Sequence, residues 1–278
     1  MYRLWIVGLT LLAALALAQK PLEFPVDQPF KTSLPLRGAA GERVQLSLAQ
    51  GSSQLDLVLP NRAQSLTIGT LSDGFEPKGM VLAADFNFDG WLDLAVPMAV
   101  GYGGVNYFYE IYFYNPRTQH YELLGVPGAY DGQFCNPEIS QLEKILLTSC
   151  KSGPSYNYTD YRFIAGKPYV YRTSQMFPLA GFTQNDVVYA THFYEQGGKL
   201  VWTLWNDNPR DHRPARRTVT QARVYLYDKP DPNSKTKTYL VKGDPVEVVG
   251  VSPADYAWVR IAYKSRQKGR VVAWVYFP

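Results

Sequence analysis

Histidine and cysteine, which carry much of the acid–base, nucleophilic and zinc chemistry of proteins, are scarce in this chain. Its 278 residues include three histidines and two cysteines. His120, His192 and His212 lie far apart, and none belongs to an H-E-x-x-H or other zinc-binding spacing. The G-x-S-x-G pattern of serine hydrolases and the phosphate-binding P-loop are also missing. We therefore expect a binding protein and not an enzyme.

Long hydrophobic runs are missing after the first 18 residues. Residues 4–17 are apolar, Arg3 precedes them, and Ala16-Leu17-Ala18 is a small-x-small cleavage pattern. We therefore expect residues 1–18 to be a signal peptide. The run is shorter than the roughly 20 residues that span a bilayer, which argues against an uncleaved anchor, and no cysteine follows the cleavage site to carry a lipid. The sequence predicts a periplasmic or secreted protein with no membrane span.

The two cysteines, Cys135 and Cys150, have a simple explanation in an exported protein. An even pair in an oxidising compartment is expected to form a disulfide. The alternative is a free catalytic thiol, as in Cys–His wall hydrolases. Such an enzyme requires an activated thiolate. We favour the disulfide.

Long helical periodicities are also missing, whereas turn residues and aromatics are frequent. The chain has 22 Gly, 20 Pro and 21 Tyr, a pattern typical of many short strands joined by turns. We expect an all-β protein with one short helix around residues 137–142.

The charge is uneven along the chain. Residues 19–209 carry 13 Lys+Arg and 18 Asp+Glu, whereas residues 210–278 carry 14 Lys+Arg and 6 Asp+Glu. This change of sign predicts two units with different partners.

The predicted organisation is a larger antiparallel β domain (19–205), a basic linker (206–220) and a small C-terminal domain (221–278). The linker contains two prolines and four arginines. Clustered arginines can mark nucleic-acid binding, but no aromatic platform surrounds these and the protein is expected to be exported. We expect no nucleic-acid partner.

One stretch of the larger domain, Asp85-Phe86-Asn87-Phe88-Asp89-Gly90-Trp91-Leu92-Asp93, has the pattern of a calcium-binding loop. Side-chain oxygens occupy positions 1, 3, 5 and 9, a glycine at position 6 allows the bend, and the carbonyl at position 7 would add a ligand. An EF-hand needs helical flanks and a glutamate at position 12, where this chain has Val96. We expect a strand-loop-strand calcium site, and an Asx-rich hairpin turn is the alternative. The predicted ligands are Asp85, Asn87, Asp89, Trp91 and Asp93.

The C-terminal domain has a recognisable order of strands and turns. Lys242-Gly243-Asp244-Pro245-Val246-Glu247-Val248 comes first, Trp258-Val259-Arg260-Ile261 follows, and residues 269–275 close with G-x-V-x-x-W-V. In this order the last 58 residues resemble the bacterial SH3-like domain. The resemblance implies a small barrel, which in exported bacterial proteins often binds cell-wall peptides, so peptidoglycan is an expected partner. The alternative is a structural module packed on its neighbour.

Four motifs follow one another in the larger domain. They are the calcium loop, the Y-N-P-x-T turn at 114–118, S-G-x-x-Y at 152–156 and Y-x-F-x-x-G-K-P at 161–168. Over residues 40–175 they resemble a family of exported bacterial proteins. These proteins are related to periplasmic inhibitors of invertebrate-type lysozyme and to calcium-binding immunity proteins against peptidoglycan hydrolases.

The resemblance implies that the loop carrying S-G-x-x-Y enters the cleft of a lysozyme-like enzyme and meets its catalytic carboxylates. Ser152 and Tyr156 would insert, Gly153 would allow the bend, and Lys151 would complement an acidic cleft. A Cys135–Cys150 bridge would preorganise the loop. The expected function is therefore inhibition of a peptidoglycan-cleaving enzyme, with calcium in a structural role. The alternative is a cell-wall-binding or adhesion module that has no enzyme target.

Overall fold

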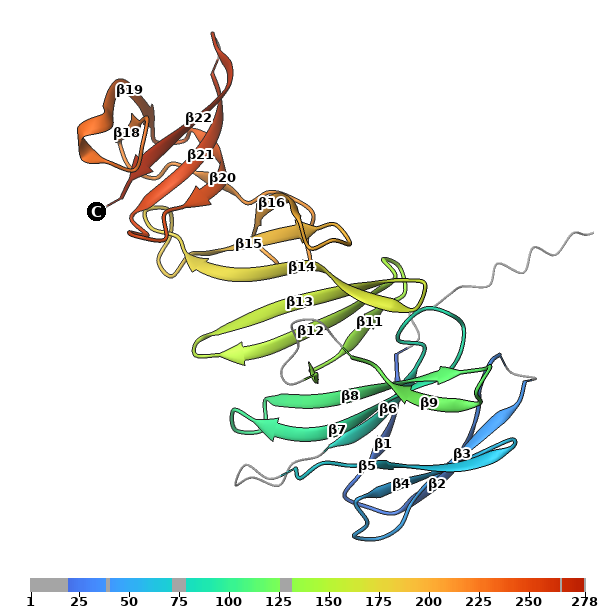
Figure 1. Ribbon diagram of the computed structural model, residues 1–278. Coiled ribbons are helices and arrows are strands. Elements are labelled where there is room, and N and C mark those ends of the chain that lie inside the picture. Colours follow the sequence, from blue (N-terminus) through green and yellow to red (C-terminus); the bar gives the residue numbers. More distant parts are fainter. Residues whose placement is uncertain (1–19, 39–40, 72–78, 126–131, 266, 278) are drawn as a thin grey trace, which may run out of the picture.

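The computed structural model describes residues 20–38, 41–71, 79–125, 132–265 and 267–277, so the predicted signal peptide lies outside the described residues. The all-β prediction is confirmed. Apart from one 3-10 turn, η1 (Pro232–Ser234), every regular element in these ranges is a strand, and neighbouring strands pair antiparallel. Within the same ranges, no helix is long and apolar enough to cross a membrane. Four sheets follow one another along an elongated molecule (Figure 1).

The central sheet holds the predicted calcium loop. Its strand order is β1-β6-β7-β8-β10, with β9 beside β8. Alternate residues of β6 and β7 pack on opposite faces, because Val81 and Leu94 belong to one core cluster whereas Leu82 and Ala95 belong to another. This double burial explains why β6 and residues 94–97 of β7 are continuously apolar. The strands are β1 (Leu22–Pro25), β6 (Met80–Ala84), β7 (Asp93–Gly101), β8 (Asn106–Asn115), β9 (His120–Leu123) and β10 (Phe134–Cys135).

The N-terminal sheet covers one face of the central sheet. Its strands alternate between buried leucines and exposed polar residues, which places Leu46, Leu55 and Leu57 in a shared core with Val81 and Leu94. The strands, in order, are β2 (Phe30–Pro35), β3 (Arg43–Leu48), β4 (Gln54–Leu59) and β5 (Arg62–Thr67).

The middle sheet packs on the opposite face, where Leu146 and Tyr161 join Ile111 and Phe86 of the central layer. Its strands are consecutive in sequence and form a meander. They are β11 (Glu138–Ser140), β12 (Ile145–Ser152), β13 (Ser155–Ile164), β14 (Lys167–Pro178), β15 (Val187–Tyr194) and β16 (Leu200–Asn206). The helix expected around residues 137–142 is wrong, because Glu138–Ser140 pairs with Ile145–Leu147 as an edge strand.

The C-terminal sheet has the order β17-β20-β21-β22-β18-β19. Among the described residues no pairing joins β17 to β19, so the sheet stays open where a closed SH3-like barrel was expected. Its core is shared with the middle sheet, since Leu179 and Val188 cluster with Val224 and Val275. The strands are β17 (Arg216–Thr218), β18 (Arg223–Tyr227), β19 (Lys235–Val241), β20 (Pro245–Val251), β21 (Trp258–Ser265) and β22 (Gly269–Tyr276).

The segment 206–220, expected to be a linker, is built into this fold. Arg216–Thr218 forms a strand that pairs with β20, and the flanking Ala215 and Val219 are buried in the core of the C-terminal sheet. Arg217 donates to both carboxylate oxygens of Asp186, with N–O distances of 2.6 and 2.8 Å. The segment therefore fastens the C-terminal sheet to the middle sheet.

Candidate functional site

The predicted calcium loop connects β6 to β7 as a tight turn. Phe88 has φ of 64° and Gly90 has φ of 90°, so the chain passes twice through the left-handed region. The carboxylate of Asp85 accepts the N–H groups of Asp89 and Gly90, at 3.0 and 2.8 Å. Asp89 in turn accepts the N–H of Trp91 at 2.9 Å. The first and fifth positions of the motif are thus turned into the loop.

Asp93, the ninth position, lies at the base of the loop and is fully buried. One carboxylate oxygen accepts the N–H of Phe86 at 2.9 Å, and the other accepts the N–H of Tyr114 on β8 at 3.1 Å. Burial raises the pKa of the Asp93 carboxyl well above its usual range, and the charges of Asp89 and Asp85 raise it further, whereas the two hydrogen bonds oppose the shift. Asp93 therefore fixes the loop to the central sheet.

The chemistry of this loop fits a hard cation. Its donors are oxygens alone, from Asp85, Asn87, Asp89 and Asp93, with the carbonyl of Trp91 available as a further ligand. Burial raises the pKa of Asp85 and the nearby charge of Asp89 raises it further, as at Asp93, and a divalent cation would relieve that repulsion. Across the described residues, however, no three Asp, Glu, His or Cys side chains are gathered as a formed metal site. Calcium binding stays a prediction.

The predicted target-binding residues form a two-residue β-hairpin. Ser152 pairs with Ser155 and Lys151 pairs with Tyr156, which leaves Gly153 and Pro154 as the turn. Gly153 has φ of 60°, and glycine in this first position is the mark of a type II′ turn, whose twist matches that of the strands. Ser152, Gly153 and Pro154 are exposed. The S-G-x-x-Y motif is therefore the tip of a regular hairpin and not an irregular loop.

Ser152 and Tyr156 leave this hairpin from opposite faces. Directly paired residues share a face, so Tyr156 lies with Lys151, whereas Ser152 lies with Ser155. On the first face, the rings of Tyr156 and Tyr158 are 6.3 Å apart between centroids. The two predicted binding residues can therefore reach two walls of a groove, but not one flat surface.

Neighbouring strands hold the hairpin in place. The side chain of Asn106, at the start of β8, accepts the N–H of Lys151 at 2.8 Å and donates to its carbonyl oxygen at 3.0 Å. The hydroxyl of Tyr102 donates to the carbonyl oxygen of Gly153 at 2.9 Å, and the Lys151 ammonium lies 5.6 Å from the centre of the Tyr102 ring. These contacts substitute for the edge strand β11, which ends before reaching this part of β12.

The Cys135–Cys150 disulfide predicted from the sequence is confirmed, with 5.5 Å between the Cα atoms. The next residue, Asn136, donates to the carbonyl oxygens of Val105 and Ser149, both at 3.0 Å. The disulfide and the side-chain amide of Asn136 together join the base of the hairpin to the central sheet. A disulfide also fits a protein of the periplasm or the cell exterior.

Sequence reasoning missed Asn106, Asn136 and Tyr102. Their hydrogen-bond partners lie 13 to 51 residues away along the chain, so no local pattern marks them. The sequence offers one weak signal, the residue type itself. Asparagine is several-fold enriched at positive φ, and Asn136 has φ of 44°. An asparagine next to a cysteine is nevertheless not enough to predict a side chain that holds the hairpin in place.

A charged cluster with a buried ion pair at its centre lies on strands β13 and β14. Arg172 of β14 donates to Asp160 of β13 and, at 3.3 Å, to Glu143, whose carboxylate is 3.6 Å from the His212 ring. Burial raises the pKa of Asp160 even though Arg172 opposes the shift. Arg172 and Asp160 are each 1% exposed. The pair is closed to any substrate, so its role is to tie the strands together.

Comparisons with known proteins do not identify a family. No protein-family model and no curated protein matches the chain. Among solved structures, it is similar to a Xanthomonas protein described as related to the type IV secretion system. The two share 13% sequence identity over 66% of this chain and 98% of the other, with a TM-score of 0.42. A similarity of this size carries no conclusion about function.

Proposed function

We propose that this protein is an exported inhibitor or immunity protein that blocks a lysozyme-like peptidoglycan hydrolase with the hairpin 151–156. One observation carries the proposal: the exposed tip of this hairpin is braced from behind by Asn106, Tyr102 and the disulfide. A preformed binding element loses less conformational entropy when it meets a partner. The motif in that tip is the one that the sequence resemblance assigns to target binding.

The geometry suits insertion into a narrow cleft. A hairpin that enters with its turn first presents one face to each wall, so Ser152 would meet one wall and Tyr156 the other. A lysozyme cleft holds two carboxyl groups, which can accept hydrogen bonds from the hydroxyls of an inserted hairpin. Lys151, beside Tyr156, would add favourable charge. The chain supplies no cleavable bond in this mode of binding and acts without catalysis of its own.

Calcium would have a structural role. Asp85, Asn87, Asp89 and Asp93, with the carbonyl of Trp91, would hold the ion, which would neutralise the loop and stiffen the β6–β7 connection. The C-terminal domain would keep the inhibitor near the wall. In support, Lys264 and Arg270 are paired across the β21–β22 hairpin, and of the two only Arg270 forms a salt bridge within the described residues, with Glu247 at 3.0 Å.

Inhibition assays test the proposal. The purified protein is added to lysozymes of several types and to other wall hydrolases, and lysis of peptidoglycan is followed by turbidity. Inhibition of at least one enzyme is expected, together with its loss in Ser152→Ala/Tyr156→Ala. Lys167→Ala, at the tip of the neighbouring β13–β14 hairpin, serves as the control and should inhibit normally. Failure to inhibit any enzyme in the panel would refute the proposal.

A further inference from the structure

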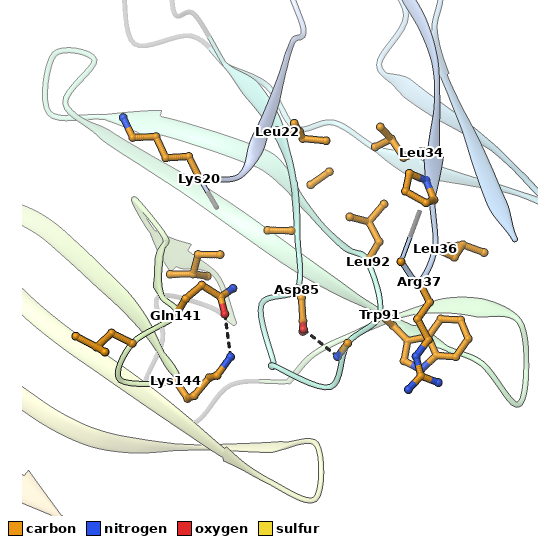
Figure 2. Close-up of a pocket in the computed structure, with 17 residues that line it drawn as sticks. Lys20, Leu22, Leu34, Leu36, Arg37, Asp85, Trp91, Leu92, Gln141 and Lys144 are labelled. Atoms are coloured by element: carbon orange, nitrogen blue, oxygen red, sulfur yellow. Dashed lines mark hydrogen bonds between the residues drawn. The ribbon is translucent and has the colours of Figure 1, made fainter. Parts of the chain in front are cut away.

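A second surface lies away from the hairpin tip, where the predicted calcium loop meets the N-terminal strands. It is a cleft of about 910 Å³, within the range of ligand-binding sites, which is about 300–1,000 Å³. Figure 2 shows its walls: Lys20 and Leu22 on one side, Gln141 and Lys144 on another, and Arg37 beside Trp91. The loop residue Asp85 lies between these walls.

The cleft has an excess of positive charge. Lys20, Arg37 and Lys144 line it, and within the described part of the chain none of them forms a salt bridge with a carboxylate. Lys144 donates to the side-chain oxygen of Gln141 at 2.9 Å. The acidic lining residue, Asp85, has both oxygens engaged by backbone N–H groups of its own loop. An anionic ligand would therefore meet three cations that no carboxylate of the described residues neutralises.

Most of the remaining lining is apolar, and part of it comes from edge strands. Three edge strands, each from a different sheet, contribute to the lining. They are β1, β2 and β11, which supply Leu22, Leu34 and Ile139. The outer side of an edge strand carries backbone N–H and C=O groups that no neighbouring strand takes up. Leu142, in the turn after β11, is 95% exposed at the rim. An extended peptide can use both features, by pairing with an edge and placing apolar side chains inside.

The aromatic lining residue is poorly placed for a sugar. Trp91 has the Arg37 guanidinium 5.1 Å from its ring centre, and its ring centroid is 5.3 Å from that of Tyr114. Stacking of a sugar ring needs an open aromatic face, and these neighbours occupy the indole. The lining therefore favours a peptide over an anionic polysaccharide.

We propose that this cleft binds an acidic peptide segment in extended conformation, with its carboxylates on Lys20, Arg37 and Lys144. The site is separate from the hairpin that meets the hydrolase. It would give the protein a second partner, recognised by charge and strand pairing.

Fluorescence anisotropy with a labelled decapeptide of alternating Glu and Val tests this inference. We expect saturable binding, and no binding of the matching Lys–Val peptide. The double variant Lys20→Glu/Lys144→Glu should bind the acidic peptide on the order of tenfold more weakly. Lys229→Glu, an exposed lysine of the C-terminal domain, should bind normally, and Ser152→Ala/Tyr156→Ala should leave peptide binding unchanged.

Three results would overturn the inference. The first is the absence of saturable binding at low ionic strength. The second is equal weakening by Lys229→Glu, which would indicate attraction to net charge alone. The third is displacement of the peptide by polygalacturonate at a lower concentration than by unlabelled peptide, which would assign the cleft to a polysaccharide.

Discussion

Removing the Asn106 side chain should loosen the binding hairpin without unfolding the protein. Asn106 is 6% exposed and makes two hydrogen bonds to Lys151, of 2.8 and 3.0 Å. An unpaired buried polar group costs about 1–3 kcal/mol, and Lys151 is only partly buried. We therefore expect Asn106→Ala to destabilise the hairpin locally by about 2 kcal/mol.

Hydrogen exchange of the Lys151 amide measures this effect directly. A loss of about 2 kcal/mol corresponds to exchange roughly 30-fold faster, since 1.4 kcal/mol is a factor of ten. Asn157→Ala is the matched control, because Asn157 is an exposed asparagine of the same hairpin. If the Lys151 amide exchanges at the same rate in Asn106→Ala as in the wild type, the proposed bracing of the hairpin is refuted.

Three further outcomes are expected. Reduction of the Cys135–Cys150 bridge, whose cysteines are 15 residues apart, should lower the free energy of unfolding by about 3 kcal/mol; urea titrations with and without reductant check this, and an unchanged midpoint would contradict it. Calcium should raise the melting temperature of the wild type but not of Asp89→Ala, and a similar rise in both would leave the loop as a plain turn. Burial lowers the pKa of His192 below its usual 6.5, so the unfolded chain takes up the proton first as the pH falls. The stability of the wild type relative to His192→Asn should therefore decrease from pH 7.5 to pH 5, and an increase would reverse the assigned sign.

The fold class and several strands could be predicted because their signals are local. Residues 43–48 alternate between apolar and polar side chains, and residues 55–59 have a leucine at every second position. Both segments are strands that bury these alternate apolar residues. The disulfide followed from an even number of cysteines in a chain expected to be exported. In each case the information lies within a few residues or in the composition.

The errors arose where distant contacts decide the structure. Residues 137–142 looked helical, but Glu138–Ser140 is an edge strand because Ile145–Leu147 offers it a partner. Residues 206–220 looked like a linker because arginine and proline dominate, yet the isolated Ala215 and Val219 are buried. The bracing of the hairpin by Asn106 could not be predicted, because it spans 45 residues and uses an amide with no distinctive neighbours.

The central claim is that the hairpin 151–156 occupies the substrate cleft of a wall hydrolase. Steady-state kinetics give the mode of inhibition and so test this occupation. They use a hydrolase that the protein inhibits and a soluble chitooligosaccharide substrate. We expect competitive inhibition, with KM raised and kcat unchanged, and its loss in Ser152→Ala/Tyr156→Ala. Inhibition that lowers kcat without raising KM, or that persists in this variant, would show that the hairpin does not occupy the substrate cleft.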